Sequence, residues 1–323
     1  MTTVITGATG HIGVNLIPAL LEQGRMVRAV IHRTKPAIAD PNLDVVKGDI
    51  GDVDSLCRAF EGADVVYHLA AAISLSKKDW PLVEKTNVVG TRNVVEACLR
   101  LGVRRLVSFS SIHAIADNDD CIDESCTLND LSCRHPYDRS KAAAERALRD
   151  GIERGLDTVI VSPTGVIGPY DWAPSFMGQA LLMMVSGKLP ARITGGFNWV
   201  DVRDVVAGAM AAEQKAVNGA KYILSGHWVS IAGITLAVHQ IAGSKVPSFI
   251  IPTRFVSFIA PLVELLYKVR KQPVLFTRMA MDSICGYGQI SHDRATRELG
   301  YKPRRFEQTI SDTLAWFGQN GYI

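Results

Sequence analysis

The chain has 323 residues, of which 47% are hydrophobic and 21% are charged. These fractions are typical of globular proteins and exclude the disordered, collagen-like and disulfide-scaffold classes. The 35 lysines and arginines nearly balance the 32 aspartates and glutamates, so the formal net charge is only +3. Since the basic charge is scattered, nothing indicates binding to nucleic acid. The length predicts two lobes, or one large α/β domain with an elaboration.

The sequence gives no indication of export, membrane insertion or metal binding. The first residues contain neither a basic leader nor an apolar run with a cleavage site, so we expect a cytoplasmic protein. The best candidate for a membrane span, residues 246–267, is interrupted by Arg254, Glu264 and prolines, and a span needs about 20 mainly apolar residues. We predict an apolar helix there, and the sequence leaves open whether it touches a membrane surface. The cysteines include no C-x-x-C pair, so we expect reduced thiols and no metal.

Short apolar runs alternate with segments of helical period in the first half of the chain. The predicted strands cover residues 4–5, 26–31, 45–46, 65–69, 106–109 and 158–161. The predicted helices between them cover residues 13–22, 55–60, 83–100 and 137–154. Such alternation requires right-handed crossovers and predicts an α/β, Rossmann-type doubly wound parallel sheet. Pro18 lies inside the first predicted helix and should kink it or remove one hydrogen bond.

A glycine-rich loop joins the first predicted strand to the first predicted helix, which is where a dinucleotide fingerprint is found. Gly7 permits the tight turn, Gly10 lets the backbone approach a pyrophosphate, and Gly13 lets helix and strand pack closely. Amide groups at the helix N-terminus would face the phosphates. The sequence therefore predicts a dinucleotide site. The same loop offers further cofactor contacts: Thr9, His11 and Ile12.

The residues after the second predicted strand indicate which dinucleotide binds. A site for NAD normally offers a carboxylate to the ribose 2′-hydroxyl at this point, and this chain has none there. His32, Arg33 and Lys35 are basic, and such groups suit the 2′-phosphate of NADP. We therefore expect NADP(H). The alternative is that Arg33 and Lys35 form only a solvated loop, in which case NAD(H) is possible.

The pattern loosens after about residue 165, where an uncharged stretch at 172–187 precedes a helix that begins after Asp201. A strand at 222–224 is expected to complete the sheet. We assign residues 1–165 to the dinucleotide-binding domain, to which the chain returns at about 198–225. The remaining ranges, 166–197 and 226–323, then form a smaller, mainly helical substrate-binding lobe.

Together these motifs resemble the extended short-chain dehydrogenase/reductase superfamily, also called the NAD-dependent epimerase/dehydratase family. The resemblance covers nearly the whole chain. Besides the glycine loop, it rests on these segments: Gly48-Asp49-Ile50, His68-Leu69-Ala70-Ala71, Thr86-Asn87-Val88-Val89-Gly90-Thr91, Ser110-Ser111, Tyr137-Asp138-Arg139-Ser140-Lys141, 163–169, 199–205 and 299–304.

Three residue types in this set suit acid/base chemistry on a carbonyl oxygen. Tyr137 and Lys141 are four residues apart on one predicted helix, so their side chains leave the same face. The lysine cation is expected to lower the tyrosine pKa by favouring the phenolate. Such a tyrosine gives a proton to the oxygen as hydride arrives, or removes it during alcohol oxidation. Ser111 can stabilise charge on the same oxygen, and Ser110 is the competing assignment.

The resemblance implies further roles. Tyr137 and Lys141 contact the cofactor, Lys141 through the nicotinamide ribose. Asn87 supports a helix and a water-linked proton path, with a purely structural role as the alternative. A homodimer is expected from the family alone. Further implied cofactor contacts lie near the adenine, the adenosine side and the nicotinamide side: Asp49 and Ile50; Leu69, Ala70 and Ala71; Pro163 and Val166.

Two enzyme classes share this cofactor machinery. A reductase uses NADPH once per turnover, whereas an epimerase or dehydratase keeps NAD and returns the hydride. Sugar-nucleotide members commonly carry an asparagine for the substrate diphosphate where this chain has Gly165. With basic His32 and Arg33, this favours the branch that resembles dihydroflavonol reductases and 3β-hydroxysteroid dehydrogenases. The alternatives are a sugar-nucleotide epimerase or dehydratase, and a non-catalytic NADP-sensing protein.

The prediction is thus an NADPH-dependent enzyme that reversibly reduces a ketone or aldehyde to an alcohol. His113 is a candidate substrate contact, with a structural role as the alternative. Several residues could line a pocket for an apolar carbonyl compound or could belong to the core: Trp172, Phe176, Met177, Met183, Met184 and Trp199.

Overall fold

The computed structural model describes residues 1–32, 34, 38–74, 76–117, 121–189, 191–253, 255, 281 and 288–323, without the side chain of Lys77. Arg33, Lys35 and most of the apolar segment 246–267 lie outside the described residues. The predictions made for them therefore stay predictions.

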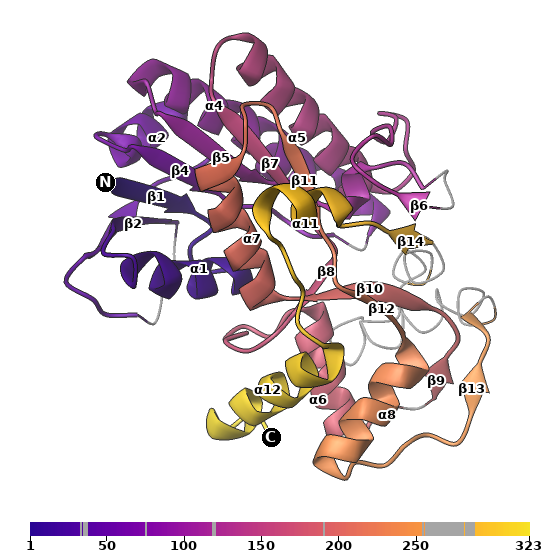
Figure 1. Ribbon diagram of the computed structural model, residues 1–323. Helices are drawn as coiled ribbons and strands as arrows, with labels where there is room; N and C mark the ends of the chain where they lie inside the picture. Colours follow the sequence, from indigo (N-terminus) through magenta and orange to yellow (C-terminus); the bar gives the residue numbers. More distant parts are fainter. Residues whose placement is uncertain are drawn as a thin grey trace.

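Among the described residues, a seven-stranded parallel sheet forms the centre of the molecule (Figure 1). Its spatial order is β11-β7-β5-β4-β1-β2-β3. The bounds are β1 (Thr2–Thr6), β2 (Met26–Ile31), β3 (Leu43–Lys47), β4 (Val65–His68), β5 (Arg105–Phe109), β7 (Thr158–Pro163) and β11 (Lys221–Leu224). The strand order reverses between β1 and β4, which makes this the switch point of a doubly wound sheet. The predicted fold class is confirmed.

Helices cover both faces of the central sheet (Figure 1). One face carries α1 (His11–Leu21), α7 (Val202–Lys215) and α11 (Asp293–Leu299), and the other carries α2 (Val53–Phe60), α4 (Gly90–Leu101) and α5 (Pro136–Glu153). The predicted helix around Pro18 is present as α1, which continues past the proline to Leu21.

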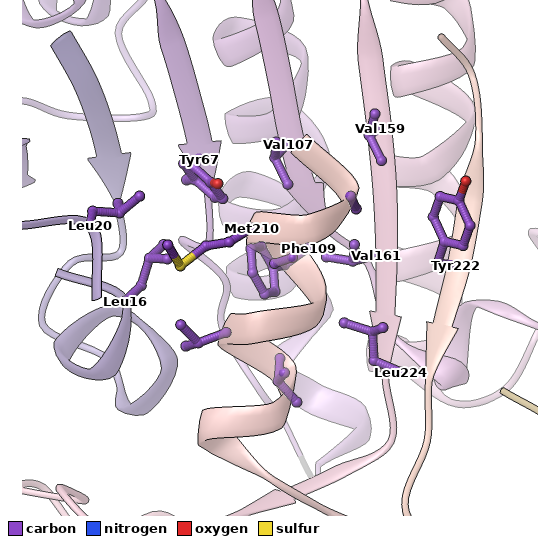
Figure 2. Close-up of a cluster of buried hydrophobic side chains, with 14 of the residues drawn as sticks. Leu16, Leu20, Tyr67, Val107, Phe109, Val159, Val161, Met210, Tyr222 and Leu224 are labelled. Atoms are coloured by element: carbon purple, nitrogen blue, oxygen red, sulfur yellow. The ribbon is translucent and has the colours of Figure 1, made fainter. Parts of the chain in front are cut away.

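A hydrophobic core lies on each face of the central sheet. Each inner strand contributes side chains to both cores, because successive side chains of a strand point to opposite faces. Figure 2 shows the core on the α7 side, where Met210 of α7 lies between Leu16 of α1 and Phe109 of β5. The strand residues of this core include Ile5, Tyr67, Val107 and Val159. Their chain neighbours pack against α2, α4 and α5 instead: Val4, Val66, Leu106 and Ile160.

The helix predicted at 83–100 is interrupted. Helix α3 (Trp80–Val83) leads into a π-helical turn, Glu84–Val89, before α4 begins at Gly90. Buried Asn87 lies in this turn and bonds to both backbone groups of Ala72, which belongs to the loop after β4. Single π-helical turns inside helices are often found at functional sites. The apolar period of the sequence continues through the turn, so it gave no sign of the interruption.

The remaining elements form a smaller, mainly helical lobe below the central sheet in Figure 1. In the described part of the chain it contains α6 (Phe176–Val185), α8 (Ile231–Ala242), α12 (Phe306–Gln319) and a small sheet of β8 (Gly165–Ile167), β10 (Gly196–Asp201) and β12 (His227–Ser230). Two pairs of short strands are also present: β6 (Cys121–Ile122) with β14 (Gln289–Ile290), and β9 (Arg192–Ile193) with β13 (Ile250–Ile251). None of the helices in the described ranges is long and apolar enough to cross a membrane.

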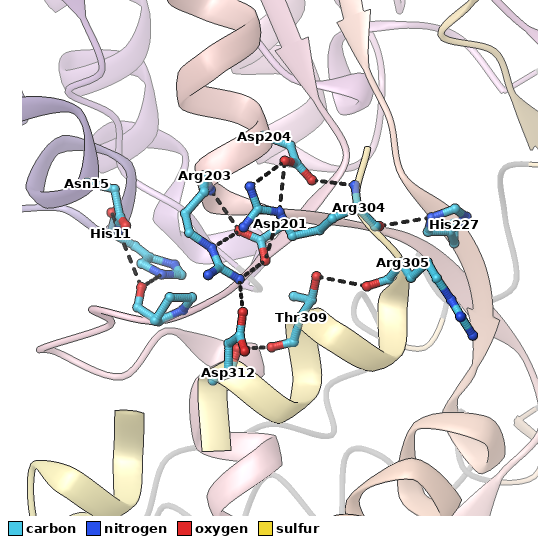
Figure 3. Close-up of polar contacts among 12 residues, drawn as sticks. His11, Asn15, Asp201, Arg203, Asp204, His227, Arg304, Arg305, Thr309 and Asp312 are labelled. Carbon is cyan, nitrogen blue, oxygen red and sulfur yellow. Dashed lines mark hydrogen bonds and ion pairs between the residues drawn. The ribbon is translucent and has the colours of Figure 1, made fainter. Parts of the chain in front are cut away.

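The chain returns to the central sheet in β11, which pairs with β7, whereas residues 198–201 belong to the small sheet. An ion-pair network joins α7 to the C-terminal helix (Figure 3). Arg203 bridges Asp201 and Asp312 of α12, each at 2.7 Å. Asp204 binds Arg304 at 2.8 Å. These contacts fix α12, and with it the lobe, against the start of α7.

A second ion pair is buried between α7 and the sheet. Glu213 of α7 accepts hydrogen bonds from Arg25 Nη1 at 2.6 Å and from the Tyr67 hydroxyl at 2.8 Å. Arg25 is 7% and Glu213 4% exposed. This pair links α7 to the turn before β2 and to β4.

Candidate active site

The predicted site residues converge on the carboxyl edge of the central sheet. The glycine loop follows β1, residues 69–71 follow β4, and the Ser110-Ser111 pair follows β5. These strands flank the switch point, where ligands of doubly wound sheets bind.

The glycine loop is closed toward the protein and open on its outer side. A Cβ at Gly7, whose φ is +73°, would lie 2.6 Å from the Ala70 nitrogen, and one at Gly13 would lie 2.5 Å from the Gly7 oxygen. At Gly10, by contrast, a Cβ would meet just the Gly7 oxygen, at 3.4 Å, among the described atoms. Thr9 and Gly10 are exposed. A ligand can therefore approach the backbone of this loop.

Two further observations fit a bound dinucleotide at this loop. The first turn of α1 carries no acidic side chain, so nothing there repels an anion. The Nε2 atom of His11 donates to the Pro169 carbonyl at 3.0 Å, while its buried Nδ1 has no partner within the described part of the chain. Asn15 donates to the same carbonyl at 3.3 Å (Figure 3). A hydroxyl of a bound ribose could donate to this buried acceptor, whereas a phosphate oxygen, itself an acceptor, could not.

The predicted adenosine contacts follow β2, β3 and β4 at the same edge of the central sheet. Asp49 is exposed after β3, and one of its carboxylate oxygens accepts from the Gly51 amide at 2.8 Å. Ile50 is half-buried, and its carbonyl accepts from Asn93 at 2.9 Å. His32 is exposed at the end of β2. The residues after β4 range from half-buried to exposed: Leu69, Ala70 and Ala71.

The two adjacent serines, Ser110 and Ser111, make different contacts in the structure. The hydroxyl of Ser111 lies close enough to the Tyr137 phenol to lower its pKa, and it accepts from the His113 amide at 3.2 Å. The hydroxyl of Ser110 donates to Glu145 at 3.0 Å. Since Ser110 is already engaged elsewhere, the geometry favours Ser111 as the partner of Tyr137.

The expectation that Lys141 lowers the pKa of Tyr137 is wrong for this structure. Burial of the phenol, with Asp138 as a further cause, raises the pKa of Tyr137 to about 12, although the Ser111 hydroxyl acts in the other direction. The ammonium group of Lys141 donates to the Phe109 carbonyl at 2.8 Å. Tyr137 is therefore protonated at neutral pH and ready to act as a proton donor.

Lys141 is 6% exposed. Burial lowers the pKa of its ammonium group to about 8, while the Glu145 carboxylate one turn further along α5 raises it. Lys141 therefore loses its charge within the pH range of an ordinary enzyme assay.

Asn87 has all three of its side-chain hydrogen bonds within the protein. Its amide donates to the Ala72 carbonyl at 2.9 Å and to the Ser140 hydroxyl at 2.8 Å, and its oxygen accepts from the Ala72 amide at 2.8 Å. These contacts tie the loop after β4 to α5. A cavity of about 10 Å³ lies between Asn87 and Lys141, which is room for roughly one water molecule.

His68 lines the same cavity and was not singled out by the sequence analysis. Its Nε2 lies 3.1 Å from the Thr91 hydroxyl, which itself donates to the Asn87 carbonyl. Nδ1 lies 2.7 Å from the Thr6 hydroxyl. Burial, with the Lys141 cation as a smaller cause, lowers the pKa of His68 to about 3. The imidazole is therefore neutral, and each ring nitrogen has a partner.

This shift predicts a loss of stability on acidification. Because the folded pKa of about 3 lies below the ordinary 6.5, the unfolded chain binds the extra proton between these values. The free energy of unfolding should therefore fall by about 1.4 kcal/mol for each pH unit below 6.5. Urea unfolding at pH 6.5 and pH 5 measures this slope, and His68→Gln should reduce it by about 2 kcal/mol over the interval. His227→Gln, at an exposed position, serves as the control. An unchanged slope in His68→Gln would show that another group dominates.

The ring of His113 packs against Tyr137, the candidate proton donor. Its ring meets the Tyr137 ring edge-on at 5.6 Å and stacks on Phe197 of β10 at 5.8 Å. Its Nδ1 lies 3.2 Å from Asp138. The sequence analysis missed Phe197, because only the pairing of β10 with β8 brings it to this edge.

Trp172 and Phe176 have different surroundings. Trp172 is 44% exposed, and its ring meets Trp316 of α12 at 5.0 Å. Phe176, at the start of α6, is 41% exposed. Met184 packs in the core of the lobe. The described contacts of Trp172 are thus with the C-terminal helix, and its predicted contact with substrate stays a prediction.

The segment on the predicted nicotinamide side is tightly packed. Pro163 is buried at the end of β7, and half-buried Val166 pairs with Val200 in the small sheet. A Cβ at Gly165 would lie 2.6 Å from the Trp199 ring. The chain therefore has no room for an asparagine side chain at the position where sugar-nucleotide enzymes use one.

A doubly wound sheet with an open glycine loop at its switch point, and with Tyr137, Lys141 and Ser111 at the same edge, defines a dinucleotide-dependent enzyme of the short-chain dehydrogenase/reductase type. The model of the NAD dependent epimerase/dehydratase family matches residues 3–225. The chain belongs to this family.

Relatives and a solved structure agree with this assignment. The chain is 35% identical to sterol demethylase protein B of Methylococcus capsulatus, and the match covers 100% of both chains. It is 33% identical to a putative dihydroflavonol 4-reductase of Synechocystis, over 99% of this chain and 95% of the relative. The solved structure of gox2253 has a TM-score of 0.86 and 33% identity, and covers 100% of this chain and 99% of that one. The predicted resemblance is confirmed, and the protein is an NAD(P)-dependent enzyme of the oxidoreductase or epimerase type.

Proposed function

We propose that the protein is an NADPH-dependent reductase that converts a ketone or aldehyde to an alcohol, and that it can run in reverse. The observation that carries this proposal is that Ser111 lies next to a Tyr137 that stays protonated at neutral pH. Bound NADPH supplies a hydride to the carbonyl carbon. The matching proton comes from the Tyr137 hydroxyl and goes to the carbonyl oxygen.

Each residue of the proposed site has one task. Tyr137 donates the proton, Ser111 hydrogen-bonds the carbonyl oxygen, and the ammonium group of Lys141 holds the end of β5 through the Phe109 carbonyl. Lys141 would also hold the nicotinamide ribose. Asn87 holds α5 in register with the loop after β4, which keeps Tyr137 in place.

The proposed substrate is an apolar ketone or aldehyde. Two relatives are named for a sterol and a dihydroflavonol, which supports a ring-containing substrate of low polarity. The packing at Gly165 argues against a sugar nucleotide. We place the substrate near His113, Trp172 and Phe176. The division into a dinucleotide-binding domain, residues 1–165, and a substrate lobe, residues 166–197 and 226–323, is part of the same proposal.

A fluorescence titration of cofactor-stripped protein with NADPH and with NADH tests the cofactor. We expect NADPH to bind at least tenfold more tightly, about 1.4 kcal/mol, with little nucleotide retained on purification. Arg33→Ala should weaken NADPH binding and leave NADH binding nearly unchanged, because only NADPH carries the 2′-phosphate. Arg100→Ala, at an exposed position on α4, is the control. Retained NAD, or tighter NADH, would favour an epimerase or dehydratase instead.

A further inference from the structure

Glu145 is a fully buried carboxylate on α5, one turn after Lys141. Both of its oxygens accept from Lys221 of β11 at 2.9 Å. One oxygen also accepts from Ser110 at 3.0 Å, and the other accepts from Arg149 at 3.2 Å. The carboxylate therefore joins α5 to the end of β5 and to β11.

Stability alone does not explain this cluster. Lys141 and Lys221 are 6% and 5% exposed, so two lysines and one carboxylate lie in the interior. Transferring charges from water to the interior costs free energy, and apolar side chains of similar volume commonly give an equal or greater stability. The cluster is better explained by its effect on the neighbouring residues.

Three side chains of α5, each one turn apart, hold three successive residues at the end of β5. Lys141 donates to the carbonyl of Phe109, and Glu145 accepts from Ser110. Tyr137 lies close enough to Ser111 for the serine hydroxyl to lower its pKa. Since Ser110 and Ser111 are neighbours in the chain, the bond to Glu145 limits where the Ser111 hydroxyl can lie relative to Tyr137.

Glu145 also supplies the negative charge next to Lys141. The groups that face this lysine are Glu145 on α5 and neutral His68 on β4. Both the lysine and the carboxylate line the cavity of about 10 Å³. The groups that face Glu145 in turn are Lys141 and Arg149 on α5 and Lys221 on β11. Without this carboxylate, the cations in the cluster would repel one another with no compensating charge.

We propose that Glu145 is a positioning residue of the reaction: it holds Ser111 against Tyr137 through Ser110, and it keeps the buried side chain of Lys141 cationic. This inference rests on the proposed roles of Tyr137, Ser111 and Lys141. Glu145 itself touches neither substrate nor the reacting atoms in this proposal.

The first test is the pH profile of kcat for Glu145→Gln. The amide keeps the size of the carboxylate and can still accept from Ser110, but it removes the charge. We expect the alkaline fall in kcat to move to lower pH by about one unit, because Lys141 loses its proton more easily. The KM for the carbonyl compound should change little.

Two variants separate charge from position. Ser110→Ala removes the bond to Glu145 and leaves every charge in place, so kcat should fall about tenfold to hundredfold, as expected for a hydrogen bond to a charged group, with an unmoved pH profile. Asp204→Asn is the matched control, because Asp204 is another buried carboxylate paired with an arginine, Arg304. It should lower the melting temperature without moving the pH profile.

The double variant Glu145→Gln/Lys221→Gln keeps the test decisive if Glu145→Gln folds poorly. It removes one negative and one positive charge, so it should recover stability, and its alkaline fall in kcat should lie at lower pH than that of Lys221→Gln, which keeps the carboxylate. If these two profiles coincided, the charge of Glu145 would have no role in holding the proton on Lys141.

A measurement without turnover separates this inference from the proposed function. In protein labelled with ¹³C-lysine, the Cε resonance of Lys141 reports its titration, and Lys141→Arg identifies the signal. We expect this titration to move to lower pH in Glu145→Gln and to stay fixed in Asp204→Asn. An unmoved titration, or a Glu145→Gln variant with unaltered kcat and pH profile, would overturn the inference. A moved titration in a protein that reduces no carbonyl compound would overturn the proposed function alone.

Discussion

Replacing Tyr137 by phenylalanine is expected to lower kcat for carbonyl reduction by about 10²-fold to 10⁴-fold, the usual contribution of one general acid. The phenol is the proton donor of the proposed reaction, and its high pKa keeps the proton in place until the oxygen becomes basic. The phenyl ring preserves the edge-on contact with His113. NADPH should therefore bind nearly as before.

NADPH oxidation with a panel of apolar ketones and aldehydes measures kcat, and nucleotide fluorescence measures the dissociation constant. Tyr222→Phe is a matched control, because the Tyr222 hydroxyl bonds to Glu298 on the far side of β11. It should leave kcat unchanged. If Tyr137→Phe kept the turnover of the unaltered protein, the proton would have to come from another group.

Replacing Glu213 by glutamine is expected to cost about 3–5 kcal/mol of stability, because it leaves the charge of Arg25 buried without a partner. The carboxylate accepts from Arg25 at 2.6 Å and from the Tyr67 hydroxyl at 2.8 Å. An amide removes the charge and offers the arginine only a neutral acceptor. Since Glu213 lies on α7 and away from the carboxyl edge, the folded fraction should keep its kcat.

The free energy of unfolding from urea titration measures this loss. Glu96→Gln is the comparison, since Glu96 forms its ion pairs with Arg100 and Arg154 at the surface. Exposed pairs contribute little, so this variant should be close to the unaltered protein. Equal losses in the two variants would mean that burial adds nothing to the strength of the Arg25–Glu213 pair.

The sequence was sufficient for the features that depend on local pattern. Buried strands such as β2 appear as apolar runs, and the central sheet follows from their alternation with helices. The glycine loop and the spacing of Tyr137 and Lys141 are equally local. For these features, the local sequence pattern was enough to predict what the structure shows.

Other features depend on contacts between residues far apart in the chain. Lys221 reaches Glu145 across 76 residues, and Asn87 reaches Ser140 across 53. The pKa of Tyr137 was misjudged because spacing reveals a nearby lysine but not the depth of burial, and here burial dominates. A charged residue such as Glu145 on the apolar face of α5 is the one local sign that could have been noticed.

The late position of β11 in the chain has a consequence for biosynthesis. When residues 1–163 have left the ribosome, β7 is complete but lacks its neighbour β11, and residues 164–220 must still follow. During this interval β7, buried throughout its length in the final fold, is an open edge that can pair with another nascent chain. During the same interval, Glu145 lacks its partner Lys221, which has not yet been synthesised. Shortened chains that end before Leu224 are therefore expected to aggregate, and chaperone protection matters most while this stretch is being synthesised.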